Sequence, residues 1–127
     1  MKDTMSTNTY FCDTYALLEI IGGNPAYQQY LDQRLITSTL NLMELYYALL
    51  RDYGEEIAES YFALWASAAF DLPLPIIPGA MQFKQTHKKE DLSYIDCMGY
   101  TFSCQRQVRF LTGDEKFKDK GTVEFVK

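Results

Sequence analysis

The stretch TNTYFCDTYALLEIIGGNP, residues 7–25, joins a short strand pattern directly to a helix pattern. Thr7 to Cys12 is rich in β-branched and aromatic residues, which predicts a strand. Thr14 to Ile21 has helical spacing and stops at Gly22-Gly23, where glycine commonly ends a helix. Asn24-Pro25 then suits the cap and first position of another helix. A strand followed at once by a helix is typical of α/β proteins.

The rest of the chain continues this alternation of short apolar segments and longer helix patterns. The further expected strands are Arg34 to Thr37, Leu72 to Ile77, Val108 to Thr112 and Thr122 to Val126. The further expected helices are Leu40 to Arg51, Glu55 to Phe70, Ala80 to Lys89 and Ser93 to Gln105. Prolines limit the Leu72 to Ile77 segment to a short or edge strand. We therefore expect one α/β domain over residues 1–127, with helices covering a parallel sheet.

The composition is that of an ordinary globular protein, with 47% hydrophobic and 23% charged residues. No apolar run approaches the ~20 residues that a membrane helix needs, and residues 1–10 contain no hydrophobic signal segment. The three cysteines, Cys12, Cys97 and Cys104, lack metal-site spacing, so we expect buried, reduced thiols in a cytoplasmic protein. The net charge of −5 argues against nonspecific, tight binding to nucleic acid, although bound cations reverse the charge of an acidic site.

Four acidic residues differ from the others because they stand in largely uncharged surroundings. They are Asp13 in YFCD, Glu44 in LNLMELYYALL, Asp96 in LSYIDCMGYTFSC and Asp114 in RFLTGD. An ionised carboxylate in apolar surroundings is costly unless it is paired or binds a metal. Few Lys or Arg residues stand near these positions in the sequence.

The expected elements bring these four acids to one edge of the sheet. Asp13 and Asp114 directly follow strands, whereas Glu44 and Asp96 lie near the starts of helices. In parallel α/β sheets, functional groups gather where strands end and helices begin. Four carboxylates there would repel one another unless divalent cations lay between them, and Mg²⁺ and Mn²⁺ prefer such oxygen ligands.

Each acid also has a purely structural interpretation. Asp13 suits the N-cap of the helix at Thr14, and Asp114 suits the cap of a short turn. Asp96 stands three residues after Ser93, and Glu44 three after Asn41, which is the spacing of a capping box. Capping explains each acid singly, but it does not explain why Glu44 and Asp96 are the only ionisable groups in long uncharged stretches.

Four segments of the chain resemble the PIN-domain family. YFCDTYALLEIIGGNP is similar to the family's opening, with an acid at the end of the first strand. NLMELYYALL and SYIDCMGYTFS are similar to the helices that carry the second and third acids, and FLTGDEKF resembles the TxDxxF segment of the fourth. These motifs occur in the family's order over nearly the whole chain. Cys104 departs from the small residue expected at its position, which concerns packing.

The resemblance implies a three-layer α/β/α fold and a nuclease whose acid cluster binds Mg²⁺ or Mn²⁺. Carried over by motif, the catalytic and metal-binding residues are Asp13, Glu44, Asp96 and Asp114. Small members of the VapC toxin type cut RNA, are held inactive by a small antitoxin and are often homodimers. We expect Asp13 and Asp96 to bind metal directly, and Glu44 or Asp114 to bind metal or to orient water.

Other polar residues are weaker candidates. Thr14 and Thr112 could position water or phosphate, although ordinary helix-start and strand roles explain them at least as well. Lys84 and Lys88 could steer RNA, although a solvated helix face explains these lysines better. His87, the only histidine, is expected at the surface without a catalytic role. Five aromatic residues are expected mostly in the core, with some forming a groove for a partner helix. They are Tyr46, Tyr47, Tyr61, Phe62 and Trp65.

Four other functions make different demands on the sequence, and the motifs of the first two are not convincingly present. A phosphoryl-transfer enzyme would carry DxDxT after the first strand, where this chain has Asp13-Thr14-Tyr15. A response receiver would carry paired acids and a lysine after its last strand, and no convincing pattern of that kind is present. A non-catalytic binding module and an RNA maturation or decay nuclease without an antitoxin both stay compatible with these residues.

Overall fold

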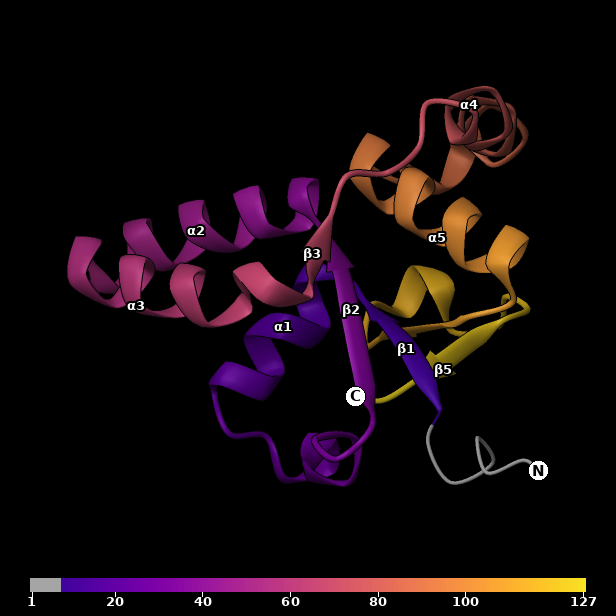
Figure 1. Ribbon diagram of the computed structural model, residues 1–127. Helices are drawn as coiled ribbons and strands as arrows, with labels where there is room; N and C mark the ends of the chain where they lie inside the picture. Colours follow the sequence, from indigo (N-terminus) through magenta and orange to yellow (C-terminus); the bar gives the residue numbers. More distant parts are fainter. Residues whose placement is uncertain (1–7) are drawn as a thin grey trace.

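The computed structural model describes residues 8–127, and a five-stranded parallel sheet forms its centre (Figure 1). The strand order is β3-β2-β1-β4-β5. The strands are β1 (Thr9–Cys12), β2 (Arg34–Ser38), β3 (Ala69–Phe70), β4 (Arg109–Thr112) and β5 (Val123–Phe125). Strand β1 therefore lies in the middle of the sheet, between β2 and β4. Thr7, which the sequence placed in the first strand, lies outside the described residues.

Helices cover both faces of this sheet, which confirms the three-layer α/β/α arrangement (Figure 1). The α-helices are α1 (Thr14–Ile21), α2 (Thr39–Tyr53), α3 (Glu55–Trp65), α4 (Ile76–Thr86) and α5 (Tyr94–Arg106). Short 3₁₀ helices are η2 (Pro25–Tyr30), η3 (Ala66–Ala68), η4 (Lys88–Glu90) and η5 (Glu115–Phe117). No helix formed by residues 8–127 is long and apolar enough to cross a membrane.

Alternating side chains of the central strand supply two separate cores. Tyr10 and Cys12 join the core formed with α1, η2, α2 and α3, whereas Phe11 joins the core formed with α4, α5 and η5. The second core is rich in phenylalanine, and the Phe11 ring stacks on that of Phe110 with centroids 5.9 Å apart. This alternation follows from the two-residue period of a strand that is buried on both faces. Asp13 comes directly after this strand, whose last three residues are buried.

The expected long helix from Glu55 to Phe70 is wrong in its last five residues. Helix α3 ends at Trp65, and after η3 the chain forms strand β3, in which Ala69 pairs with Thr37 and Phe70 with Ser38. The ASAAF sequence at the end of this stretch has high helix propensity because it is rich in alanine. Pairing with β2 outweighs that propensity.

The expected strand from Leu72 to Ile77 is also wrong. Residues 71–75 form a turn, and α4 begins at Ile76, four residues before the expected start at Ala80. Pro78 lies in the first turn of α4, where backbone N–H groups have no partner within the helix, so proline fits there without breaking it. The edge strand that the sequence placed in this region is β3, which comes directly before it.

Some residues expected in the core are exposed. Cys12 and Cys97 are buried as expected, but Cys104 is exposed near the end of α5. Tyr47 and Phe62 are exposed, while the other three aromatic residues named above are partly buried and pack against the first core. A surface helix buries only one stripe of side chains against its neighbours. Helices α2 and α3 carry more apolar residues than this stripe can hold, so some of them are exposed.

Candidate functional site

Asp13 is held in place by hydrogen bonds from two different elements. It follows β1 and caps α1, because its Oδ1 accepts from the Ala16 N–H at 2.8 Å. Its Oδ2 accepts from the Thr112 hydroxyl at 2.5 Å, from the end of the neighbouring strand β4. The side chain is only 3% exposed. The capping role expected from the sequence is therefore real, and it uses only one of the two carboxylate oxygens.

The surroundings of Asp13 disfavour its charge. Burial is the largest cause, and it raises the pKa of Asp13 to about 7 although two hydrogen bonds act in the opposite direction. Repulsion from Asp96 and Asp114 adds to the increase. Cys12 beside it has a raised pKa through burial and the nearby Asp13 charge, so its thiol stays protonated and is not an activated nucleophile.

Asp96 and Asp114 approach Asp13 from the other side of the sheet edge. Asp96 lies in the first turn of α5, where its N–H donates to the Ser93 hydroxyl at 3.0 Å. Its pKa is raised, first by burial and then by the charges of Asp114 and Glu44. Asp114 caps η5 through the Lys116 N–H, and its own N–H donates to the Thr112 hydroxyl at 3.0 Å. Thr112 thus links Asp13 to Asp114.

Glu44 is fixed by a chain of hydrogen bonds that begins at the end of β2. The Ser38 hydroxyl donates to Asn41 Oδ1 at 2.7 Å, and Asn41 Nδ2 donates to the Thr14 hydroxyl at 3.0 Å. Thr14 then donates to Glu44 Oε1 at 2.6 Å. The expected capping box between Asn41 and Glu44 is wrong, because Ser38 caps α2 and Glu44 turns toward α1 instead.

Asp96 is therefore close enough to be repelled by Asp13, Asp114 and Glu44, and the ion pairs within residues 8–127 include none of these four acids. In the same residues, no three Asp, Glu, His or Cys side chains could hold one metal ion as they stand. The repulsion accounts for this absence, because carboxylates with no cation between them stay apart and accept hydrogen bonds from protein donors instead. All the candidate ligands are carboxylate oxygens, and a divalent cation would relieve their repulsion. The residues present fit Mg²⁺ or Mn²⁺.

Comparison with protein families gives one match that spans most of the chain. The PIN domain family model matches residues 10–123, which include all four acids. This chain belongs to the PIN domain family. A search of curated protein sequences gave no significant match.

Solved structures share the fold of this PIN domain at low sequence identity. Mycobacterium tuberculosis VapC20, described as a sarcin-ricin loop cleaving toxin, is 16% identical with a TM-score of 0.78, over 93% of this chain and 99% of that one. Rickettsia felis VapBC2 bound to promoter DNA is 16% identical with a TM-score of 0.74, over 94% and 99%. A Klebsiella pneumoniae toxin–antitoxin complex is 14% identical with a TM-score of 0.69, over 91% and 95%.

The sequence did not predict that Ser38 and Asn41 belong to the candidate site of this PIN domain, where they hold Glu44 in place through Thr14. Both are almost fully buried, and Asn41 is 1% exposed. Their signal was present, because a serine ends strand β2 and an asparagine lies in the otherwise apolar start of α2. In the sequence, Ser38 looks like an ordinary helix cap. Asn41 contacts Thr14, which lies 27 positions away in the chain, so its role has no local pattern.

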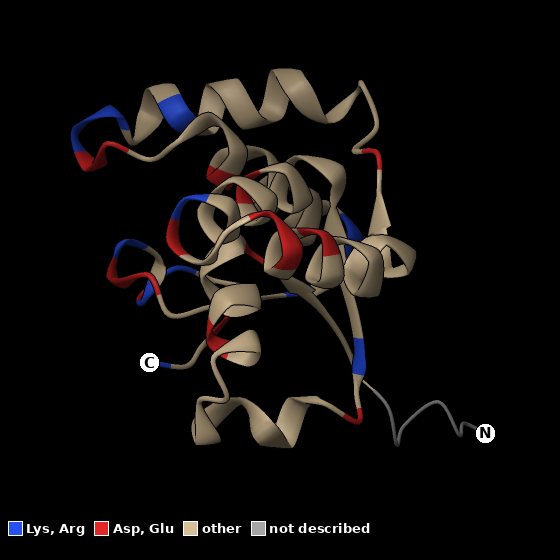
Figure 2. Cartoon of the chain, turned by 90° about the vertical axis from the view of Figure 1, so that its left-hand side faces the viewer, with Lys and Arg blue, Asp and Glu red and all other residues tan. Residues whose placement is uncertain are grey.

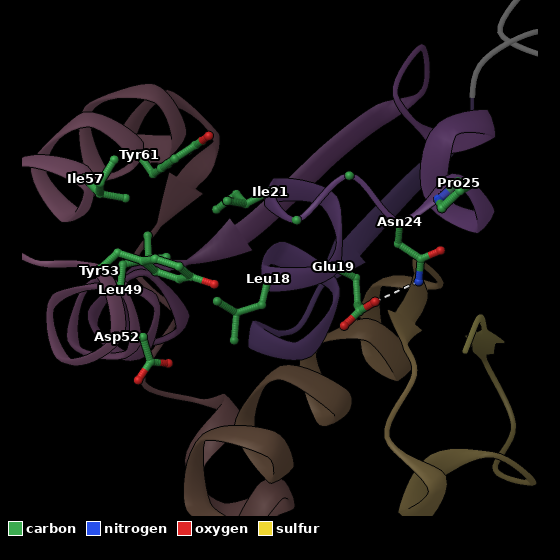
Figure 3. Close-up of a pocket in the computed structure, with 12 residues that line it drawn as sticks. Leu18, Glu19, Ile21, Asn24, Pro25, Leu49, Asp52, Tyr53, Ile57 and Tyr61 are labelled. Atoms are coloured by element: carbon green, nitrogen blue, oxygen red, sulfur yellow. Dashed lines mark hydrogen bonds between the residues drawn. The ribbon is translucent and has the colours of Figure 1, made fainter.

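A groove lies between α1, α2 and α3 (Figure 3). Its volume is about 740 Å³. Its apolar walls come from Leu18 and Ile21 of α1, Leu49 and Tyr53 of α2, and Ile57 and Tyr61 of α3. At one end, Asn24 donates to Glu19 at 2.7 Å. Of the five aromatic residues considered for a partner groove, only Tyr61 lines it.

Lys and Arg residues occur in several separate segments of the chain, as the blue ribbon in Figure 2 shows. Lys84 donates to the Leu92 carbonyl and lies over the Tyr94 ring, 4.7 Å from Nζ to the centroid, so it is engaged locally. His87 is half-buried, with Nδ1 3.0 Å from the Phe83 carbonyl oxygen, and is not fully at the surface as expected.

Proposed function

We propose that this PIN domain is a metal-dependent endoribonuclease that hydrolyses RNA phosphodiester bonds, and that it is the toxin of a toxin–antitoxin pair. The observation that carries the proposal is the set of four carboxylates gathered at one sheet edge, where Asp96 and Asp114 repel the charge of Asp13 and Asp114 and Glu44 repel that of Asp96, with no Lys or Arg of residues 8–127 paired to any of them. A fold that only needed these acids as helix caps would not require them to lie at the same edge. The VapC structures that share the fold support the toxin assignment.

Asp13 and Asp96 are proposed to hold Mg²⁺ or Mn²⁺, because burial and like charge make their anionic forms most dependent on a cation. When bound, such an ion acidifies water and neutralises charge that develops on phosphate. Asp114 is positioned by Thr112 to extend the same ligand set. The Glu44 carboxylate, fixed by Thr14, is proposed to accept a proton from the attacking water through its free oxygen.

The test is cleavage of single-stranded RNA, transfer RNA and ribosomal RNA by the purified chain, freed of any bound antitoxin, with Mg²⁺ or Mn²⁺. Asp13→Asn and Asp96→Asn should each reduce the rate by more than about 100-fold, since removing even an outer-shell partner of a metal ligand costs 10–100-fold. Glu90→Gln is the matched control, because Glu90 is an acid paired with Lys120.

The outcomes separate the possibilities clearly. Metal-dependent cleavage lost in both variants and kept in the control supports the proposal. Cleavage that survives both substitutions points to a contaminant or to a different site. Absence of cleavage on all three RNA classes, together with absence of thermal stabilisation by Mn²⁺, would favour a non-catalytic binding module.

The antitoxin is proposed to place an apolar segment in the groove between α1, α2 and α3. The groove has apolar walls with Glu19, Asn24 and Asp52 among its lining residues, and at about 740 Å³ it is large enough for several side chains. Solved toxin–antitoxin complexes share this fold, which supports an antitoxin partner for this chain. Ile57→Glu should abolish co-purification with the product of a neighbouring small gene, whereas Leu64→Glu, an exposed position of α3 outside the groove, should not.

The homodimer implied by the family resemblance and the cytoplasmic location expected from the cysteines belong to the same proposal. Light scattering of the purified chain tests the dimer directly. A mass close to 14.7 kDa at micromolar concentration would contradict it.

A further inference from the structure

A second cavity of about 600 Å³ adjoins the acid cluster. Thr14 and Glu44 form the wall nearest the acids, and Ile95 of α5 lies beside Asp96. The opposite wall comes from Met43, Tyr47 and Arg51. These three residues stand four apart in α2, so they lie one above another on one face of the helix.

The side chains on that face are unusually apolar for a solvent-facing position. Met43 is 57% exposed and Tyr47 is 63% exposed, although burial of either in the core would be favourable. Single exposed apolar residues are common on proteins, but these two line a cavity that Glu44 also lines. An aromatic ring is therefore presented beside the proposed catalytic acids.

Arg51 supplies positive charge at the same place. Its guanidinium lies over the Tyr47 ring, 5.8 Å from the centroid. Its Nε and Nη2 donate to Asp52 Oδ1 and Oδ2 at 2.8 and 3.0 Å, in a bidentate, solvent-exposed pair between chain neighbours. A phosphate oxygen would compete with the Asp52 carboxylate for this guanidinium, in an exposed position where salt screens the pair.

We propose that this cavity binds a nucleobase of single-stranded RNA, with Tyr47 stacking on the base and Arg51 contacting an adjacent phosphate. The inference rests on the proposed ribonuclease function and adds a substrate class to it. Bases in a duplex hide their faces against their neighbours, whereas unpaired bases expose them for stacking on aromatic rings. With a net charge of −5 and basic residues in several separate segments of the chain, phosphate contacts alone give this chain little affinity for RNA. Stacking supplies affinity that does not depend on a basic surface.

The position of the cavity also fixes which nucleotide it serves. Because Glu44 lines both the cavity and the acid cluster, the base in the cavity belongs to a nucleotide next to the phosphate being cut. The groove for the proposed antitoxin is lined by other residues of α2, so this cavity is a separate surface.

The test compares Tyr47→Leu, which keeps apolar bulk without the ring, with Tyr47→Phe, which keeps the ring. Phe62→Leu is the matched control, since Phe62 is an exposed aromatic residue of α3 that lines neither cavity. The first readout is the kinetics of single-stranded RNA cleavage. Tyr47→Leu should raise KM about tenfold with little change in kcat, while Tyr47→Phe and Phe62→Leu should behave like the wild type.

The second readout reports stacking without cleavage. Short single-stranded RNAs carrying 2-aminopurine at one position at a time are titrated into the Asp96→Asn protein. At one labelled position the fluorescence should be quenched on binding, and adding Tyr47→Leu should remove the quenching. Arg51→Gln should weaken binding and reduce its dependence on salt.

Failure of the inference is distinguishable from failure of the proposed function. If the wild type cuts RNA and Tyr47→Leu leaves KM and quenching unchanged, the ribonuclease stands and the base-binding cavity is wrong. A Tyr47→Leu protein that loses antitoxin binding but keeps RNA kinetics would mean that the surface binds protein, which also overturns the inference. A wild type that neither cuts nor binds RNA would overturn both.

Discussion

Carboxylates occupy two kinds of environment in this PIN domain. Glu90 lies 2.7 Å from Lys120 Nζ, and Glu124 lies 3.0 Å from Arg109 Nε. The Lys120 ammonium lowers the pKa of Glu90. At the carboxyl edge of the sheet, burial and like charges instead raise the pKa of Asp13 and of Asp96. Acids with the same chemistry are thus stabilised as anions in one region and destabilised in the other.

This difference separates acids that a neighbouring cation compensates from acids that pair with no Lys or Arg among residues 8–127. A surface acid is compensated by a neighbouring cation, so its charge costs the fold little. The edge acids accept hydrogen bonds from Thr112, Ala16 and Thr14, which hold the carboxylates in position without supplying positive charge. The fold therefore holds these acids in a costly arrangement that a divalent cation would relieve.

The largest expected effect is on the pH dependence of stability in the metal-free protein. The folded-state pKa of Asp13, about 7, lies above its ordinary value, so its contribution to stability is fully present below about pH 4 and is lost as the pH rises through 7. Asp13→Asn removes this loss and should stabilise the metal-free protein at pH 8 by up to about 4 kcal/mol. The asparagine can keep both hydrogen bonds, since its oxygen accepts from Ala16 and its amide can donate to Thr112.

Urea denaturation in EDTA from pH 5 to 8 measures this effect as the difference between the two proteins. Glu90→Gln is the control, because Glu90 has a lowered pKa and its contribution is lost as the pH falls. If Asp13→Asn were instead less stable than the wild type at pH 8, the charge of Asp13 would not destabilise the fold, and the two regions would not differ in this respect.

The next largest effect concerns metal. Mn²⁺ should raise the Tm of the wild type, equivalent to about 3 kcal/mol at a concentration 100 times Kd. Asp13→Asn and Asp96→Asn should lose most of this stabilisation, whereas Glu124→Gln should keep it, since Arg109 already compensates Glu124. Differential scanning fluorimetry with and without EDTA measures it. Equal stabilisation of all four proteins would mean that metal binds elsewhere.

Much of the fold could be predicted from the sequence because α1, α2, α5 and the strands β1, β2 and β4 have strong local patterns. Strand β3 could not, because only two residues pair with β2 and their sequence favours a helix. Tyr47 was expected in the core because the helix pattern shows which residues share a face, but not which face the sheet covers.

The four acids were predictable for a different reason. Charged residues in apolar stretches are conspicuous wherever they occur, and strand ends in a parallel sheet meet at one edge. The residues that hold them are inconspicuous in sequence. Ser38 and Asn41 act through Thr14, on a different element, and such contacts between distant positions leave no local pattern. The cavity at Tyr47 likewise needs α5 to provide Ile95.

A smaller effect tests whether the hydrogen-bond chain to Glu44 belongs to the site. Asn41→Ala removes the amide that donates to Thr14, so Thr14 is free to rotate and Glu44 loses its fixed partner. We expect kcat for RNA cleavage to fall about tenfold, with KM unchanged, as for other residues that orient functional groups. Because Asn41 is buried, stability is measured in parallel, and Leu42→Ala serves as a buried control on the same helix. A fall in kcat that merely follows the loss of folded protein in both variants would mean that Asn41 has only a structural role.

The smallest expected effect lies in the region of paired acids. Lys120 bonds to Glu90 across the gap between η5 and η4, but both side chains remain partly exposed to solvent. Replacing Glu90 with Gln, Lys120 with Met, or both should leave RNA cleavage within about twofold of the wild type, because exposed pairs contribute little and are screened by salt. A double-mutant cycle in urea isolates the pair, and its coupling should shrink as NaCl is raised. The edge acids should show the opposite sign, since salt screens the repulsion between Asp13 and Asp96 and so stabilises the metal-free protein. If NaCl changed the contributions of both regions to the free energy of unfolding in the same direction, charge compensation would not distinguish the two regions.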